Sequence, residues 1–128
     1  MIDHLSVAVG DYALSRRFYD AALAPLGYRP VMEFGQGAGY GEADHPSFWI
    51  TGEGDLSEQI GRWRGFHIAF EAKDRAAVDA FYQAALAAGG KDNGAPGLRP
   101  DYHPNYYAAF VIDPDGYRIE AVCHRPQS

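Results

Sequence analysis

The chain has 128 residues, of which 47% are hydrophobic and 14% aromatic, and its formal net charge at pH 7 is −6. This length and apolar content fit one globular domain and argue against a disordered chain. No basic stripe is visible and no apolar run approaches the length of a membrane span, so we expect no nucleic-acid partner, no membrane partner and a cytoplasmic location.

Residues 4–27 and 67–90 are two copies of one pattern. His67 follows His4 by 63 positions, and at this spacing ten of 24 aligned residues are identical, including a Phe-Tyr pair and an Ala-Ala-Leu-Ala run. Self-similarity at a fixed spacing indicates repeated supersecondary units. We therefore expect a single domain over 1–128 that is made of two pseudo-symmetric modules. Module 1 is expected over about 1–52 and module 2 over about 65–124, with a linker at 53–64 that contains one helical turn at 56–60.

Module 1 is predicted to run β-α-β-β-β. Apolar and polar residues alternate over 2–9, which is the period of a strand with two distinct faces. Asp11 is placed to cap a helix from about 12 to 26, and Gly27 is placed to end it. The three later strands are expected at 29–34, 39–43 and 47–51, with a glycine-rich turn before the second.

Module 2 is predicted to repeat this order. A strand over 66–72 precedes a helix that Asp74 caps and that ends near residue 88. Residues 113–116 read Asp-Pro-Asp-Gly, which is a strong hairpin signal. The strands that this turn joins are expected at 105–112 and 117–122. Residues 91–104 are rich in Gly, Pro and Asn and are predicted to form a long loop with room for one poor strand.

Three side chains in these strands are predicted to hold a metal ion. His4 and His67 take matching positions, and residues of equal parity share a strand face, so the two imidazoles converge if the sheets enclose a cavity. Glu120 lies in the last strand, and we predict it as both ligand and catalytic residue. Two imidazoles and one carboxylate leave open metal positions and suit Fe, Mn, Ni, Co or Zn. The alternative interpretation is two structural histidines and a surface Glu120 paired with Arg118 or Arg125.

Four further side chains are predicted to bind a substrate: Trp49, His103, Tyr107 and Arg118. His103 and Tyr107 belong to an aromatic group before the hairpin turn, where a ligand could stack or form hydrogen bonds. Aromatic groups are also common in cores and cavity walls. Arg118 could hold an anionic substrate, and the preferred alternative for an arginine of this kind is solvation at the surface.

The paired modules, the histidine near the start of each, and the segment DPDGYRIEAV resemble the vicinal oxygen chelate superfamily. This group includes glyoxalase I, extradiol dioxygenases, and the fosfomycin- and bleomycin-resistance proteins. The resemblance implies an α+β fold in which two β-α-β-β-β modules form a curved sheet around a cavity, with the helices outside. It also implies metal ligands at His4, His67 and Glu120, and a homodimer, in some members with modules exchanged between chains.

Trp49 departs from the pattern of glyoxalase I, which has a carboxylate ligand near this place. The remaining three-ligand set is more similar to the dioxygenase and fosfomycin-transferase pattern.

Two functional hypotheses follow. The first is a metal-dependent enzyme acting on a small oxygen-bearing metabolite or xenobiotic, as a lyase or isomerase, a transferase or a dioxygenase, with the metal as Lewis acid. The second is a metal-free protein that sequesters an aromatic drug, supported by an acidic surface that attracts cations and by several aromatic residues. These residues are Trp49, Trp63, Tyr102, Tyr106 and Tyr107. The metal content of the purified protein discriminates between the two.

Overall fold

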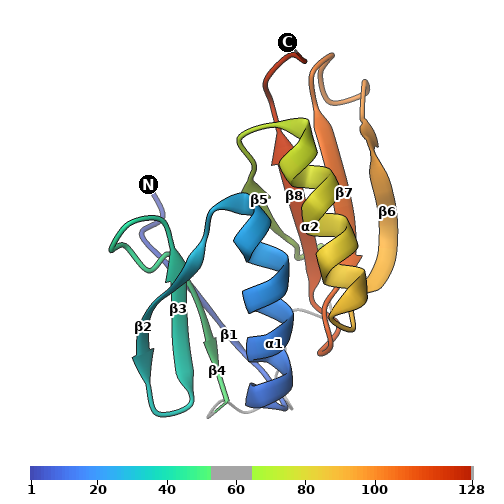
Figure 1. Cartoon of the computed structure of the whole chain (residues 1–128). Coiled ribbons are helices and arrows are strands. Elements are labelled where there is room, and N and C mark those ends of the chain that lie inside the picture. Colours follow the sequence, from blue (N-terminus) through green and yellow to red (C-terminus); the bar gives the residue numbers. More distant parts are fainter. Residues whose placement is uncertain (53–64, 128) are drawn as a thin grey trace.

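The computed structural model of the chain describes residues 1–52 and 65–127, and its two modules follow the predicted order (Figure 1). Module 1 consists of β1 (Leu5–Ala8), α1 (Tyr12–Leu23), the 3-10 turn η1 (Ala24–Leu26), β2 (Arg29–Phe34), β3 (Gly37–Gly41) and β4 (Phe48–Thr51). Module 2 consists of β5 (Ile68–Glu71), α2 (Arg75–Ala87), β6 (Lys91–Leu98), β7 (Tyr107–Ile112) and β8 (Arg118–Cys123). The predicted helical turn at 56–60 and Trp63 lie outside the described residues.

Both helices begin as the sequence predicts. The Asp11 carboxylate accepts a hydrogen bond of 3.1 Å from the Leu14 N–H, and the Asp74 carboxylate accepts one of 2.8 Å from the Ala77 N–H. These bonds satisfy amide groups that have no partner inside the helix. Gly27 ends η1 with a φ of 87°, a left-handed conformation that glycine adopts without a steric penalty.

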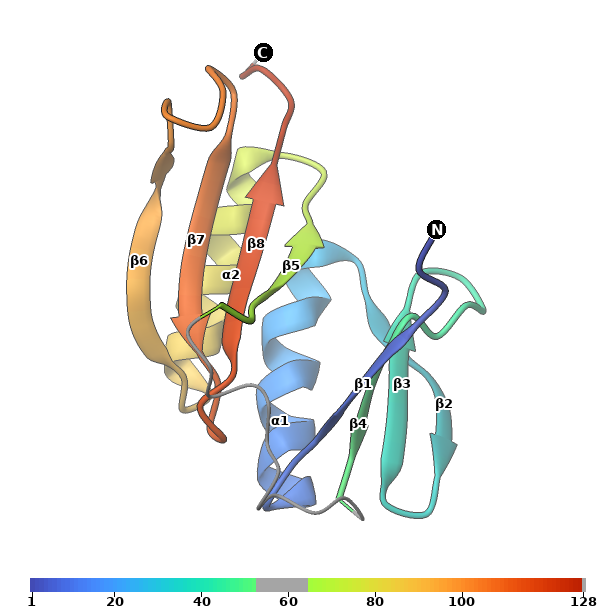
Figure 2. The ribbon, with the colours of Figure 1, turned by 180° about the vertical axis from the view of Figure 1, so that it is seen from behind.

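The strands form two four-stranded mixed sheets, in the orders β1-β4-β3-β2 and β5-β8-β7-β6. The α+β class and the paired modules are therefore confirmed. No ladder joins β1 to β5 among the described strands, so the predicted curved sheet consists of two separate halves. Both helices lie on one side of the molecule, where they contact each other (Figure 1), and the other faces of both sheets are turned away from them (Figure 2). We call these the open faces.

The registers of the two sheets preserve the repeat. Ser6 of β1 lies opposite Trp49 of β4, and Ala69 of β5 lies opposite Glu120 of β8. Ser6 and Ala69 are separated by the same spacing as His4 and His67. Trp49 and Glu120 therefore hold equivalent places on the two open faces.

The segment 91–104, predicted as a long loop with room for one poor strand, contains strand β6 (Lys91–Leu98) at the edge of the second sheet, so the strand is longer and the loop shorter than expected. Two register shifts interrupt its pairing with β7, on either side of Gly94, whose φ is 147°. Pro96 is tolerated because an edge strand needs hydrogen bonds on one side only. Bulges of this kind break the alternation from which a strand is predicted.

The core is continuous between the modules. Phe18 of α1 and Phe81 of α2 are equivalent in the repeat and both are fully buried. A Cβ atom at Gly90 would lie 2.7 Å from the Phe18 ring, so glycine at this position lets module 2 pack closely on α1. Phe48 of β4 meets Phe70 of β5 edge to face, with ring centroids 5.2 Å apart.

The turn between β7 and β8 fastens module 2 to module 1. Asp113 is buried, and its carboxylate accepts a hydrogen bond from the Tyr19 hydroxyl of α1. Asp115 accepts from the Gly10 N–H, and the Tyr117 hydroxyl donates to the Ala8 carbonyl, at 2.9 Å and 2.7 Å. The hairpin that carries Glu120 is thus held against the start of α1.

None of the helices in the described ranges is long and apolar enough to cross a membrane.

Candidate functional site

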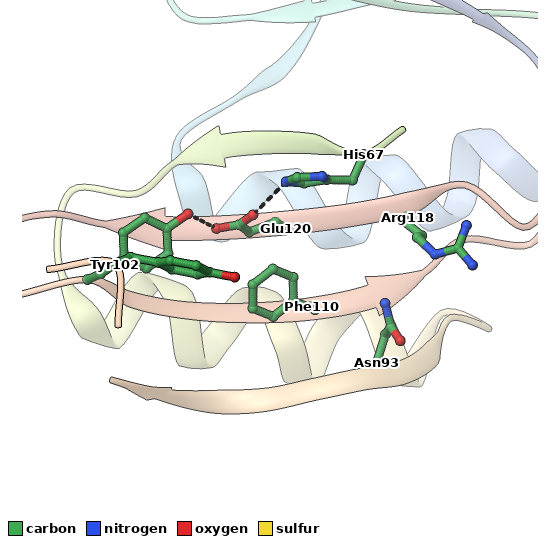
Figure 3. Close-up of a pocket in the computed structure, with 7 residues that line it drawn as sticks. His67, Asn93, Tyr102, Phe110, Arg118 and Glu120 are labelled. Atoms are coloured by element: carbon green, nitrogen blue, oxygen red, sulfur yellow. Dashed lines mark hydrogen bonds and ion pairs between the residues drawn. The ribbon is translucent and has the colours of Figure 1, made fainter. Parts of the chain in front are cut away.

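A histidine and a buried carboxylate meet on the open face of the second sheet (Figure 3). His67 precedes β5, and its Nε2 lies 3.1 Å from Oε1 of Glu120 on β8. The Glu120 side chain is only 1% exposed, whereas that of His67 is 51% exposed. A buried carboxylate requires partners, because desolvation of an unpaired charge is costly. His67 supplies one such partner.

Tyr106 supplies the second partner. Its hydroxyl donates a hydrogen bond to Oε2 of Glu120, so the two oxygens of this carboxylate contact different residues. Burial, and then the hydrogen bond to Glu120, raise the pKa of the Tyr106 hydroxyl well above its ordinary value. Tyr106 therefore stays protonated at neutral pH and acts as a donor.

Two imidazoles pack against the Tyr106 ring. His103 and His124 meet the ring edge to face, with centroid distances of 5.4 and 5.2 Å. The Asn105 N–H donates to Nδ1 of His103, so Nε2 of a neutral His103 carries the proton and donates to Nδ1 of His124 at 2.9 Å. This histidine pair fixes where the Tyr106 ring lies.

The carboxylate opens into a pocket of about 470 Å³, a size that suits a small ligand. It is lined by His67, Asn93, Tyr102, Tyr106, Phe110, Arg118 and Glu120. Arg118 and Asn93 lie together at one end, Tyr102 lies at the other, and Phe110 lies between them (Figure 3). A ligand would therefore meet polar donors at one end and aromatic rings along the rest of the pocket.

His4 lies on the other open face. It lines a separate pocket of about 340 Å³ together with Trp49 and four other residues. The Nδ1 of His4 is 2.8 Å from Oδ2 of Asp3, and this hydrogen bond lowers the pKa of the Asp3 carboxyl. A carboxylate on one imidazole nitrogen is the usual support for a metal-binding histidine, since it orients the ring and presents the other nitrogen.

Trp49 lies flat on the first sheet beside this pocket. A Cβ atom at Gly39 would lie 2.7 Å from the indole, so the glycine in β3 makes room for it. Its ring also stacks on Phe34 with centroids 6.0 Å apart and planes 10° from parallel. An indole here supplies an apolar surface, where the equivalent position of the second sheet supplies a carboxylate.

Residues 1–121 match the family model described as Glyoxalase/Bleomycin resistance protein/Dioxygenase superfamily. The chain belongs to this superfamily. It is 29% identical over 130 residues to the uncharacterised protein YqjT of Bacillus subtilis, across 93% of this chain and 95% of that protein.

Solved structures agree with this membership. A glyoxalase/bleomycin resistance protein from Albidiferax ferrireducens superposes with a TM-score of 0.78 at 33% identity, over 96% of this chain and 97% of the other. A glyoxalase I mutant from Zea mays superposes with a TM-score of 0.65 at 22% identity, over 94% of this chain and 46% of that longer chain. At that identity the likeness to the maize protein shows the fold alone.

The superfamily includes metal-dependent enzymes, and the geometry of His67 and Glu120 fits a metal ion. Ligand atoms about 2.0–2.2 Å from one ion are separated by about 3.0–3.5 Å at the usual bond angles. The 3.1 Å between His67 Nε2 and Glu120 Oε1 falls within this range, and imidazole and carboxylate are suitable donors. Within the described part of the chain, no group of three or more His, Cys, Asp or Glu side chains is placed to hold an ion. One chain therefore offers two ligands together and His4 apart from them.

The residues predicted to bind substrate are distributed over several places. Arg118 lines the pocket with Glu120, Trp49 lines the pocket of His4, and His103 packs against the Tyr106 ring. The Tyr107 hydroxyl donates to Asp79 of α2, on the helix side of the sheet.

Tyr106 and Asn93 were not predicted to line the site, although Tyr106 was noted among the aromatic residues. Strand alternation could have identified Tyr106. Phe110 of β7 lies opposite Glu120, and even-numbered residues along this segment point to the same open face as Phe110. Tyr107 has the other parity. Asn93 lies in β6, for which the sequence predicts no bounds within the expected loop, so no strand face could be assigned to it.

Proposed function

We propose that this protein is a metal-dependent enzyme of the superfamily that acts on a small oxygen-bearing metabolite or xenobiotic. His67 and Glu120 would be two ligands of the divalent ion, and His4 the third. The observation that carries the proposal is the buried Glu120 carboxylate, with Oε1 3.1 Å from His67 Nε2 at the edge of a ligand-sized pocket. A carboxylate with no function on this face would be expected in solvent.

We further propose that His4 reaches the site from a second copy of the chain. His4 and His67 hold equivalent positions on the two open faces, and β1 and β5 are both edge strands of the sheets that the described residues form. Two copies that place the first open face of one chain against the second open face of the other would unite all three ligands twice. A homodimer is therefore expected, and a protein that stays monomeric across micromolar concentrations in sedimentation would contradict it.

A divalent ion bound there would supply a Lewis acid for a carbonyl or enediolate oxygen of the substrate. The chain's own residues would bind and orient that substrate. Arg118 and Asn93 would hold a polar or anionic end, and Phe110 would support an apolar body. Glu120 is the only carboxylate lining the pocket among the described residues, so it is also our candidate for the group that takes up a substrate proton.

Thermal unfolding with added Mn²⁺, Ni²⁺, Fe²⁺ or Zn²⁺ tests this proposal. A ligand that binds only the folded state raises its stability by RT ln(1 + [L]/Kd), or about 2.7 kcal/mol at 100 times Kd. We expect the wild type to be stabilised and Glu120→Gln to lose most of the effect.

Glu71→Gln is the matched control for this variant. It makes the same Glu-to-Gln change at an exposed residue of the neighbouring strand β5. This variant should respond to the metals like the wild type. Absence of a metal effect in the wild type would contradict the proposal.

The second candidate is a metal-free protein that sequesters an aromatic cation. The observations in its favour are the rings of Tyr102, Tyr106 and Phe110 around the pocket and the net charge of −6. Under this alternative, His67 and Tyr106 simply neutralise and satisfy Glu120. Affinity for a planar organic cation that is unchanged by metal and by chelator would favour it.

A further inference from the structure

We infer that Tyr106 is a positioning residue, which holds Oε2 of Glu120 so that Oε1 alone is presented beside His67 to a bound metal ion. This inference rests on the proposed function. It assigns a role to a side chain that precedes β7 and is not itself a proposed metal ligand.

The unequal surroundings of the two carboxylate oxygens carry the inference. Oε2 accepts the hydrogen bond of the Tyr106 hydroxyl, and Oε1 lies 3.1 Å from the His67 nitrogen. Carboxylates bind metals through one oxygen or through both, and outer hydrogen bonds decide the orientation of the ligand. With Oε2 engaged by Tyr106, Glu120 is prepared to bind through one oxygen. His67 and Oε1 of Glu120 would hold the metal, and the hydrogen bond from Tyr106 to Oε2 would be kept.

The Tyr106 hydroxyl is suited to this role, because it lies within hydrogen-bond distance of the Glu120 carboxylate. A phenol keeps its proton at neutral pH, so the hydroxyl is available as a donor to Oε2 of Glu120. Because Glu120 is 1% exposed, water would not readily replace this donor.

Three neighbouring rings contact the Tyr106 ring, and these contacts fix the position of its hydroxyl. His103 and His124 meet it at interplanar angles of 75° and 84°. Tyr102 meets it edge to face, with centroids 4.9 Å apart. An outer donor positions a ligand only when its own rotamer is fixed, and this packing fixes it.

Tyr102 also provides a matched control. It lines the same pocket and touches the same ring, yet its hydroxyl forms no hydrogen bond within the described residues. Tyr106→Phe and Tyr102→Phe each remove one hydroxyl from one pocket, and only the first removes the donor to Glu120.

The experiment measures the dissociation constants of Mn²⁺, Ni²⁺ and Zn²⁺ by calorimetry for the wild type, Tyr106→Phe, Tyr102→Phe and Glu120→Gln. Loss of an outer-shell partner typically weakens metal affinity by about 10–100-fold, which is the effect expected for Tyr106→Phe. Tyr102→Phe should bind like the wild type. His103→Ala keeps the hydroxyl but removes a support of the ring, so it should weaken binding by less than Tyr106→Phe does. It also tests the inference if Tyr106→Phe does not fold.

The outcomes separate this inference from the proposed function. If the wild type binds metal, Glu120→Gln does not, and Tyr106→Phe binds like Tyr102→Phe, then the role of Tyr106 is overturned while the proposed metal site stands. If the wild type binds none of the metals, the proposed function is overturned, and the inference with it. A lower melting temperature of Tyr106→Phe with unchanged metal affinity assigns Tyr106 a structural role only and also overturns the inference.

Discussion

On the first open face Trp49 lies opposite Ser6, and on the second Glu120 lies opposite Ala69. The backbones at these two places match in strand order and register. The first face carries an indole that stacks on Phe34, and the second carries a buried carboxylate with two partners. Duplication has thus kept the scaffold and the histidine, whereas the residue that faces the cavity from the last strand differs between the copies.

The largest loss of stability is expected in the core, where the two modules are most alike. Phe18→Ala and Phe81→Ala each empty a fully buried site at equivalent positions of α1 and α2. Each should lower the free energy of unfolding by about 3–5 kcal/mol, because the lost burial adds to the cost of the cavity. Urea denaturation of both variants measures this. A cost at one position several times that at the other would break the equivalence of the two helices.

A smaller effect on the free energy of unfolding is expected at a turn where the two modules differ in burial. Asp113, in the turn between β7 and β8, is buried, whereas Glu42, at the start of the connection between β3 and β4, is exposed. Burial raises the pKa of the Asp113 carboxyl to about 6, against the opposing effect of hydrogen bonds from Tyr19 and two backbone amides. Between about pH 4 and pH 6 the folded state therefore binds more protons at Asp113 than the unfolded state does.

Because of this difference in bound protons, the contribution of Asp113 to stability depends on pH. Its contribution to the free energy of unfolding falls by about 1–3 kcal/mol as the pH rises through that window, and it is constant above about pH 7. Asp113→Asn should remove this component when urea denaturation is repeated from pH 4 to pH 7.5. Tyr19→Phe should move the window to higher pH, because the hydrogen bond that it removes lowers the pKa. Equal pH profiles for the wild type and Asp113→Asn would contradict this account.

The smallest effect concerns two equivalent glycines that are needed for different reasons. Gly27→Ala is expected to cost about 1 kcal/mol, because the left-handed backbone disfavours a Cβ atom while the nearest side-chain atoms are 4.0 Å away. Gly90→Ala is expected to cost about 1–2 kcal/mol, because its Cβ would overlap Phe18 and the Ala85 carbonyl.

A double-mutant cycle with Phe18→Ala distinguishes the two causes. Part of the Gly90→Ala penalty should disappear when the Phe18 ring is removed. The Gly27→Ala penalty should add to that of Phe18→Ala. Additivity at Gly90 would show that close packing on Phe18 is not the reason for the glycine.

Much of the fold could be predicted because its local signals are strong. Asp11 and Asp74 cap the two helices as expected, and the Asp-Pro-Asp-Gly turn joins the last two strands. The bounds of β6 could not be predicted because two register shifts around Gly94 destroy its alternation. β3 begins at Gly37, two residues earlier than expected, because the glycine-rich segment contains only a short turn.

The candidate site was predictable only in part. Parity correctly indicates that His67 and Glu120 share a face, since parity is a property of each strand. The separation of His4 from these two residues depends on how the sheets are arranged, and no local pattern contains that information. Placing Tyr106 beside Glu120 requires the pairing register of β7 and β8, in which Phe110 lies opposite Glu120. The sequence alone does not give this register.

The central claim, that one site takes His4 from one chain and His67 with Glu120 from another, can be tested with a mixed dimer. His4→Ala and Glu120→Gln chains carrying different tags are co-expressed, and the heterodimer is isolated by sequential purification. Each homodimeric variant should lack tightly bound metal. In the heterodimer, one site loses both residues and the other keeps all three ligands, so we predict half of the wild-type metal content, measured by elemental analysis. A heterodimer with no more metal than the homodimeric variants would contradict a site shared between chains.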